Sequence, residues 1–264
     1  MIIKPSWFKK QIRYRSMKAF NRVENNNDCN FETNGEKLFL ENLFARFSSK
    51  EIKTRIIWDV GANIGGYSQI LLNSAEKYNI PTEIHVFEPT AKCFESLESK
   101  FRTYDNVFLN KKGLSNTGGK CLIYYDKEQS GLASLYRRDL GHYNIEMSKF
   151  EEIEIICARD YINQKQIPHI DILKIDIEGH ELKAFEGFGE FLSGDFIDYL
   201  QFEYGGANLD SHTSLRELYT FLECRGFKVA KIFPKGLEIR SYSPDMENFM
   251  YANYVAISNH LLEG

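Results

Sequence analysis

The chain lacks the features that mark membrane-spanning, disulfide-bonded and zinc-stapled proteins. No run of apolar residues approaches the roughly 18 that a bilayer-spanning helix needs. The N-terminus has no apolar stretch of the kind found in secretory signals. The five cysteines are scattered and form no C-x-x-C pair, which argues against a disulfide framework or a structural zinc site. We therefore expect reduced thiols and a cytoplasmic protein.

Charge is unevenly distributed along the chain, whose net charge is −4. Residues 1–24 carry one acid, Glu24, and several basic side chains, so the remainder is more acidic than the whole. These basic residues are Lys4, Lys9, Lys10, Arg13, Arg15, Lys18 and Arg22. An acidic body is a poor general binder of nucleic acid.

The basic segment also contains Trp7, Phe8, Ile12 and Phe20, a mixture typical of helices that lie on an anionic membrane surface. We expect peripheral contact of residues 1–24 with the inner membrane face. A helix packed on the body or on a second subunit is the alternative. The sequence does not indicate an oligomeric state.

The length of 264 residues fits one domain with an appendage, and the 43% of hydrophobic residues suffices for a sizeable core. We assign residues 1–34 to a basic N-terminal arm and residues 35–264 to the domain. Apolar and polar patterning predicts a helix over residues 35–50 and a polar, irregular insertion over 126–150. Strands are predicted at 55–60, 83–87, 106–109, 121–125, 154–157, 170–177, 197–203, 227–233 and 251–257. Their alternation with helices indicates a mostly parallel sheet covered on both faces.

Two segments predict a nucleotide site. In R55-I-I-W-D-V-G-A-N-I-G-G66, a short apolar strand ends in an acid and a glycine-containing turn. In H85-V-F-E-P89, a second strand ends in an acid that could accept hydrogen bonds from a ribose cis-diol. Asp59 would repel a pyrophosphate but suits a sulfonium or amino group, and so favours S-adenosylmethionine.

Two other interpretations of this loop remain open. A dinucleotide fingerprint needs G-x-G-x-x-G, and here the middle position is Asn63 instead of glycine. An NAD-dependent oxidoreductase is therefore the alternative enzyme. An ordinary strand-to-helix turn without a ligand would leave a non-catalytic interaction module.

A second cluster of ionisable residues occupies K174-I-D-I-E-G-H-E181. Asp176, Glu178 and His180 follow an apolar strand, and ligands of open α/β sheets bind at the carboxyl ends of strands. We expect these side chains, with Glu203, to meet the glycine loop there. His180 or Asp176 would act as base, oriented by Lys174 or Glu178. A simple Lys174–Glu178 ion pair, a helix-capping role for His180, and a divalent metal held by this acidic cluster are the alternatives.

These segments together resemble the FkbM family of S-adenosylmethionine-dependent methyltransferases over about residues 55–257. The segments that carry the resemblance are W58-D-V-G-A-N-I-G65, V86-F-E-P89, G113-L-S-N116, D171-I-L-K-I-D-I-E-G-H-E181 and Y254-V-A-I257. The resemblance implies an α/β class I methyltransferase, Rossmann-like fold. Its mostly parallel sheet would have seven strands, with helices on both faces.

The resemblance also implies the roles of individual residues. The methionine end of the cofactor would lie against Asp59, Gly61, Asn63, Ile64 and Gly65. Glu88, followed by Pro89, would hold the ribose. Leu114 and Ser115 would border the adenine, with Ser115 or a backbone carbonyl replacing the acid that many related enzymes have there. Lys174, Asp176, Glu178 and His180 would form the catalytic, methyl-acceptor side.

The function we predict is O-methyl transfer from S-adenosylmethionine to a hydroxyl of a sugar, glycan or glycosylated metabolite. The insertion at 126–150 would serve as a lid and recognise the acceptor. No metal ligand set is predicted, because nothing in the sequence fixes the number of ligands.

Overall fold

The computed structural model describes residues 3–49 and 52–262. Residues 1–2 of the predicted arm, Lys50 of the predicted helix and residues 263–264 of the predicted domain lie outside the described residues. Within the described ranges, no helix combines the length and apolar character needed to cross a bilayer.

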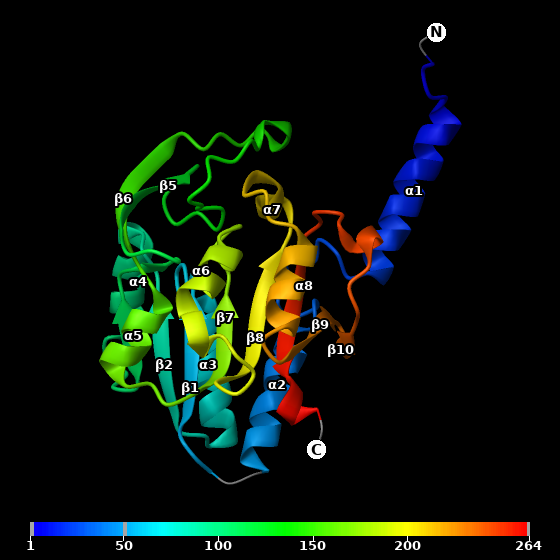
Figure 1. The fold of residues 1–264 in the computed structure, drawn as a ribbon. Coiled ribbons are helices and arrows are strands. Elements are labelled where there is room, and N and C mark those ends of the chain that lie inside the picture. Colours follow the sequence, from blue (N-terminus) through cyan, green and yellow to red (C-terminus); the bar gives the residue numbers. More distant parts are fainter. Residues whose placement is uncertain (1–2, 50–51, 263–264) are drawn as a thin grey trace.

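An eight-stranded sheet forms the centre of the molecule (Figure 1). Its strands are β1 (Arg55–Val60), β2 (Thr82–Phe87), β3 (Val107–Asn110), β7 (Ile170–Ile175), β8 (Ile197–Tyr204), β9 (Phe227–Phe233), β10 (Gly236–Ile239) and β11 (Ala252–Ser258). Their spatial order is β10-β9-β11-β8-β7-β1-β2-β3. The five strands from β3 to β8 in this order are parallel, whereas β11 is antiparallel to both β8 and β9.

The predicted α/β fold is confirmed, with one more strand than the seven expected. The chain turns after Phe233 and returns as β10, which pairs with β9 as an antiparallel hairpin at the edge of the sheet. This edge strand was not predicted, because its few residues follow β9 closely and their short apolar pattern gives no separate signal.

A second, three-stranded sheet has the order β4-β6-β5. It consists of β4 (Gly113–Leu114), β5 (Gly119–Tyr125) and β6 (Lys149–Ile156). The predicted strands at 121–125 and 154–157 belong to it, and the last two residues of the predicted irregular insertion are the start of β6. Figure 1 shows β5 and β6 above the end of the central sheet.

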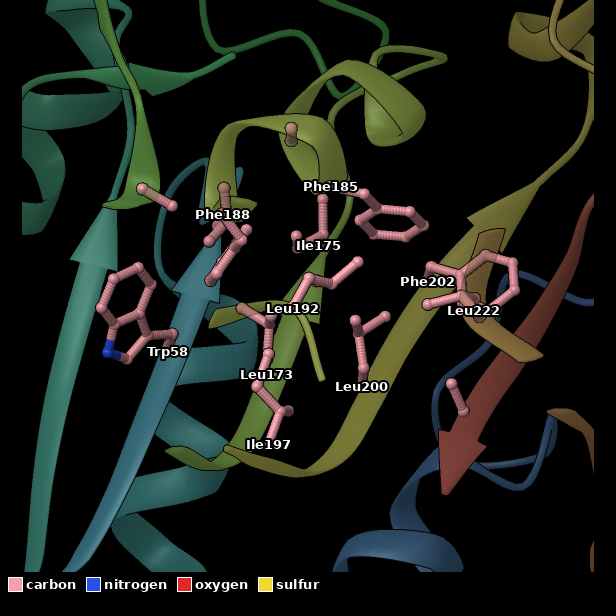
Figure 2. Packing of buried hydrophobic residues seen from close by; sticks show 14 of the residues in the cluster. Trp58, Leu173, Ile175, Phe185, Phe188, Leu192, Ile197, Leu200, Phe202 and Leu222 are labelled. Carbon is pink, nitrogen blue, oxygen red and sulfur yellow. The ribbon is translucent and has the colours of Figure 1, made fainter. Parts of the chain in front are cut away.

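Helices cover both faces of the central sheet. One face packs against α2 (Glu36–Ser48), α3 (Gly66–Tyr78) and α4 (Ala91–Phe101). The other packs against α5 (Ala158–Lys165), α6 (Glu181–Phe188) and α8 (Leu215–Glu223), as Figure 2 shows for the residues around Trp58. The remaining helical segments are α7 (Gly206–Asp210), η1 (Gly141–Tyr143), η2 (Gly189–Phe191), η3 (Pro244–Met246) and η4 (Asn259–Leu261).

The central strand β7 is buried at every residue, as expected for a parallel strand with helices on both sides. It pairs with β1 so that Asp59 lies opposite Lys174 and Val60 opposite Ile175. The backbone N–H of Asp176 then donates to the carbonyl of Val60 at 3.0 Å. This register brings the two segments singled out in the sequence to one edge of the sheet.

The helix of the basic arm, α1 (Trp7–Val23), has no buried residue and projects away from the body (Figure 1). The chain joins the body directly after it. There, Glu24 pairs with Arg240 at 2.6 Å and with Lys231 at 3.4 Å. The alternative of a helix packed on its own body therefore does not apply to α1.

Candidate active site

A cavity lies at the carboxyl ends of β1, β2 and β7, and we call it the main cavity. Gly61, Glu88 and Asp176 line it from the ends of these three strands. The small sheet lines it from the other side with the apolar side chains of Leu114, Ile123, Ile153 and Ile155. One wall of the cavity is thus polar and consists of the ends of the central strands. The other wall is apolar and belongs to the small sheet.

The loop after β1 needs glycine and asparagine for steric reasons. Gly61 has a φ of +82°, and a Cβ there would overlap the carbonyl oxygen of Asp176. Asn63 also has a positive φ, of 49°, which asparagine tolerates better than most residues. Its Nδ2 donates to the carbonyl of Ser130 at 3.1 Å, so the loop is fixed to the insertion. Both residues line the main cavity.

Glu88 follows β2 and is held by its neighbours. The backbone N–H of Asn63 donates to Oε2 at 2.9 Å, and the N–H and hydroxyl of Thr90 both donate to Oε1. Burial raises the pKa of Glu88, while these hydrogen bonds oppose the shift. Oε2 accepts a single hydrogen bond, so it has capacity for one from a ligand.

The other residues predicted to bind the cofactor divide into two groups. Pro89 and Leu114 line the main cavity. Asp59, Ile64, Gly65 and Ser115 are absent from its lining. The side chain of Ile64 is exposed, and Gly65 lies against the rings and methyl groups of α4.

Asp59 is fully buried behind the loop. Its Oδ2 accepts a hydrogen bond from the hydroxyl of Ser68, and its Oδ1 has no partner. Burial raises the pKa of this carboxyl, and the nearby ammonium of Lys174 opposes the shift. A buried carboxyl oxygen without a hydrogen-bond partner is costly.

Lys174 is buried rather than part of the cavity lining. Its Nζ lies 2.9 Å from Oδ2 of Asp176 and 5.0 Å from the centre of the Tyr67 ring. Burial alone would lower the pKa of Lys174, but the carboxylates of Asp176 and Asp59 outweigh it and raise the pKa. Lys174 therefore stays charged and orients Asp176, whose Oδ1 is left for other contacts.

His180 lines the main cavity with both ring nitrogens engaged. Nε2 is hydrogen-bonded to the hydroxyl of Ser115 at 2.9 Å and Nδ1 to that of Tyr136 at 3.0 Å. Burial, with a smaller contribution from Lys183, lowers the pKa of His180 to about 4. The imidazole is thus neutral at neutral pH, and it bridges β4 to the insertion.

Glu178 lies in an unusual backbone conformation, with a φ of 51°. The hydroxyl of Ser134 donates to its carbonyl at 2.7 Å, and Arg138 forms an ion pair with its carboxylate. Burial and the nearby Asp176 raise the pKa of Glu178 to about 8, although Arg138 opposes the shift. Strained residues held by several contacts are concentrated at functional sites.

Two further carboxyls stand near this edge. Glu203 accepts a hydrogen bond from the hydroxyl of Tyr251 at 2.9 Å, and burial together with Asp176 raises its pKa well above the usual value. Glu181 is buried, and its Oε1 accepts from the backbone N–H groups of Ile177 and Gly179. Of these two, only Glu203 was singled out as a functional candidate from the sequence.

Apart from Leu114, the residues of the apolar wall of the main cavity were missed. Residues 121–125 and 154–157 were recognisable as strands, and Ile123, Ile153 and Ile155 have the alternation that would have indicated one apolar face. What that face covers depends on how the small sheet docks, and local sequence carries no signal for that.

A metal site at the mouth has no geometric support among the described residues. Within the described residues, one group of potential metal ligands lies close together. It consists of His169, Asp171 and Asp198, whose ligand atoms lie within 4.8 Å of one another. It lies at the opposite ends of β7 and β8. Both carboxylate oxygens of Asp171 already bind Arg55 and the N–H of Ile56.

Comparison with known proteins gives a family and one similar curated protein. Residues 59–229 match the model of the methyltransferase FkbM domain. The chain is 27% identical over 133 residues to the hexuronic acid methyltransferase AglP of Haloferax volcanii. The match covers 50% of this chain and 49% of AglP, so the chain spans about half the length of that relative.

Solved structures show more distant similarity. A human methyltransferase 10 domain-containing protein is 8% identical, with a TM-score of 0.44 over 95% of this chain and 97% of that one. The fibrillarin pre-rRNA processing protein of Methanococcus jannaschii is 11% identical, with a TM-score of 0.42 over 79% of this chain and 68% of that one.

The buried carboxyl of Glu181 should make stability depend on pH. Burial raises its pKa to about 7 from the usual 4.5, so the folded protein holds a proton in that window that the unfolded chain has lost. Stability contributed by this group is therefore lost as the pH rises from about 4.5 to above 7. Glu181→Gln keeps the hydrogen-bonding Oε1. We expect its free energy of unfolding to rise by about 1 kcal/mol or more relative to wild type between about pH 5 and pH 8.

The measurement is thermal or urea unfolding of both proteins across this pH range. Glu98→Gln, an exposed change on α4, serves as the control and should show the same pH dependence of stability as wild type. A constant difference between Glu181→Gln and wild type at every pH would contradict the raised pKa.

Proposed function

Because the chain belongs to the FkbM methyltransferase family, we propose that it transfers a methyl group from S-adenosylmethionine to a hydroxyl of a sugar, glycan or glycosylated metabolite. One observation carries this proposal: a nucleotide-type loop and the Asp176–His180 cluster line the same cavity. A sugar acceptor is further supported by the partial match to a hexuronic acid methyltransferase.

The residues of the main cavity fit this cofactor. Glu88 has an oxygen with spare hydrogen-bonding capacity, which suits ribose hydroxyls. Leu114, Ile153 and Ile155 form an apolar wall suited to the adenine ring. Asp59 has an unpartnered oxygen behind the loop, and its ionised form would attract a sulfonium and oppose the pyrophosphate of NAD. S-adenosylmethionine, when bound, supplies an electrophilic methyl group.

Asp176 is the better candidate for the base that takes the proton of the acceptor hydroxyl. Lys174 fixes Oδ2, which leaves Oδ1 to accept a hydrogen bond in the cavity. His180 would have to break its hydrogen bond to Ser115 or to Tyr136 before it could accept a proton. In this proposal His180 positions the insertion, and Asp176 acts on the acceptor.

Glu88 should control cofactor affinity. Glu88→Ala removes the hydrogen bond that Oε2 can accept from a ribose hydroxyl, worth about 1.5–3 kcal/mol if charge-assisted, so the affinity for S-adenosylmethionine should fall at least roughly tenfold. Isothermal titration calorimetry with S-adenosylmethionine and, separately, with NAD measures this directly. Unchanged affinity in the variant would place the cofactor elsewhere. Binding of NAD instead would favour the oxidoreductase, and binding of neither would favour an interaction module.

Asp176 and His180 should affect turnover more than cofactor binding. Loss of a general base typically costs about 10²–10⁴-fold in rate. We expect Asp176→Asn to bind S-adenosylmethionine within a few-fold of wild type while single-turnover methyl transfer collapses. His180→Ala should lose less of its methyl-transfer rate, because His180 positions the insertion in this proposal. Near-normal methyl transfer by Asp176→Asn would mean that the cluster has a structural role. The base would then be sought at Glu203 or in the insertion.

The exposed helix α1 supports a further element of the proposal, namely contact with an anionic membrane surface. Trp7, Phe8 and Ile12 are exposed, and no residue of the helix is buried. Most helical stability in proteins comes from packing of an apolar face, so a surface that covers the apolar side chains would stabilise α1. Basic side chains near an anionic leaflet contribute about 1 kcal/mol each. In this proposal the enzyme works in the cytoplasm at the inner membrane face.

Deletion of residues 1–24 should abolish binding to anionic vesicles. We expect the full chain to pellet with phosphatidylserine-containing liposomes and to stay in solution with neutral ones, because both charge and apolar side chains are needed. The measurement is co-sedimentation of both proteins, with calorimetric cofactor binding as the control for folding. Equal pelleting of the two proteins would reject the membrane role of α1.

A further inference from the structure

A second cleft adjoins the main cavity, and we call it the side cleft. Glu178 lines both, so the two spaces meet at that residue. The other walls of the side cleft come from segments far apart in the sequence. They include Arg138 and Tyr143 of the insertion, Glu203 at the end of β8, Asn208 of α7, and Tyr251 before β11.

Two buried side chains of the side cleft carry polar atoms without hydrogen-bond partners. Glu181 is 1% exposed, and its Oε2 has no partner. Asn208 is 2% exposed; its Oδ1 caps α7 by accepting from the N–H of Gly205, and its Nδ2 has no partner. Unpaired buried polar atoms are rare and costly. A hydroxyl donates one hydrogen bond and accepts two, so it can pair with Nδ2 of Asn208 and with Oε2 of Glu181 in either protonation state.

The charges of the side cleft are strongly unbalanced. Among the described residues that line it, Glu178, Glu181 and Glu203 are acidic, and Arg138 is the basic one. Arg138 is already engaged by Glu178 and by Asp210. A carboxylate entering this cleft would find no unpaired cation among these residues, whereas an ammonium would find several carboxyl oxygens that can accept its hydrogen bonds.

Aromatic side chains form part of the same walls. Tyr204 and Phe249 lie with ring centres 5.6 Å apart, and Tyr251 lines the cleft beside them. Tyr204 is buried, whereas Phe249 and Tyr251 are half-buried and offer apolar surface for the C–H faces of a sugar ring.

We propose that the side cleft binds the methyl acceptor, and that it selects a sugar bearing an amino group over a sugar acid. This inference rests on the proposed function, since it names the acceptor of the same site. It distinguishes this chain from the similar protein, which is named for hexuronic acid and is matched over 49% of its length.

The state of the carboxyls supports this selectivity. Burial and neighbouring carboxylates raise the pKa of Glu178 to about 8 and that of Glu203 well above its usual value. With a pKa of about 8, Glu178 is largely protonated at neutral pH. An ammonium placed beside them stabilises the ionised carboxylates, so protons leave to solvent as the amino sugar binds.

Three matched probes test the proposal: the para-nitrophenyl glycosides of glucosamine, glucose and glucuronic acid. They share a ring and an aglycone, and differ mainly in carrying an ammonium, no charge or a carboxylate. Each is titrated calorimetrically into the full-length protein, with and without S-adenosylhomocysteine, in two buffers of different ionisation enthalpy. We expect the glucosaminide to bind at least about tenfold more tightly than the glucuronide, and to release protons.

Glu203→Gln tests the source of the preference, because glutamine keeps the Oε1 that accepts from Tyr251. We expect this variant to lose most of the preference for the glucosaminide, while the exposed control Glu98→Gln keeps it. Equal or tighter binding of the glucuronide, or absence of binding by all three glycosides, overturns the inference. Failure of S-adenosylhomocysteine to bind counts against the proposed function instead, since the ranking of the glycosides is measured without it as well.

Discussion

The structure of the functional edge depends on one buried ammonium. Lys174 lies in the middle of the sheet, in contact with Asp176 and within electrostatic reach of Asp59, Glu203 and Glu36. Several carboxyls around one cation cannot all ionise in a dry interior, so they share a limited amount of positive charge. The carboxyl that reaches solvent, Asp176, takes the direct ion pair. Burial raises the pKa values of Asp59 and Glu203, and Lys174 offsets only part of that shift.

Close backbone contact is the second constraint on this edge. Gly61 admits the carbonyl of Asp176, and Gly179 admits the carbonyl of Ala207, where in each case a Cβ would overlap the oxygen. The first contact joins the cofactor loop to the acceptor cluster, and the second brings α7 against that cluster. The absence of a side chain at these two glycines permits the close backbone contacts that set the geometry of both cavities.

The insertion completes the acceptor side. Ser134 binds the backbone of Glu178, Tyr136 binds His180, and Arg138 binds the Glu178 carboxylate. Glu178 and His180 are therefore both held by side chains from a segment that has little regular structure of its own. Movement of the insertion would change the hydrogen bonding of His180 and the ion pair of Glu178 together.

The sequence by itself determined the alternating fold, the two motifs and their place at strand ends, because these follow from short-range patterns of apolar residues, glycines and acids. It could therefore predict that Gly61, Asn63, Glu88 and Asp176 would line one cavity. Only the tertiary structure decided that Asp59 and Lys174 are enclosed rather than exposed, that the small sheet forms the apolar wall, and that Asn208 reaches the same region. These outcomes depend on contacts between segments distant in the chain, and the free energy of those contacts is not encoded in any local pattern.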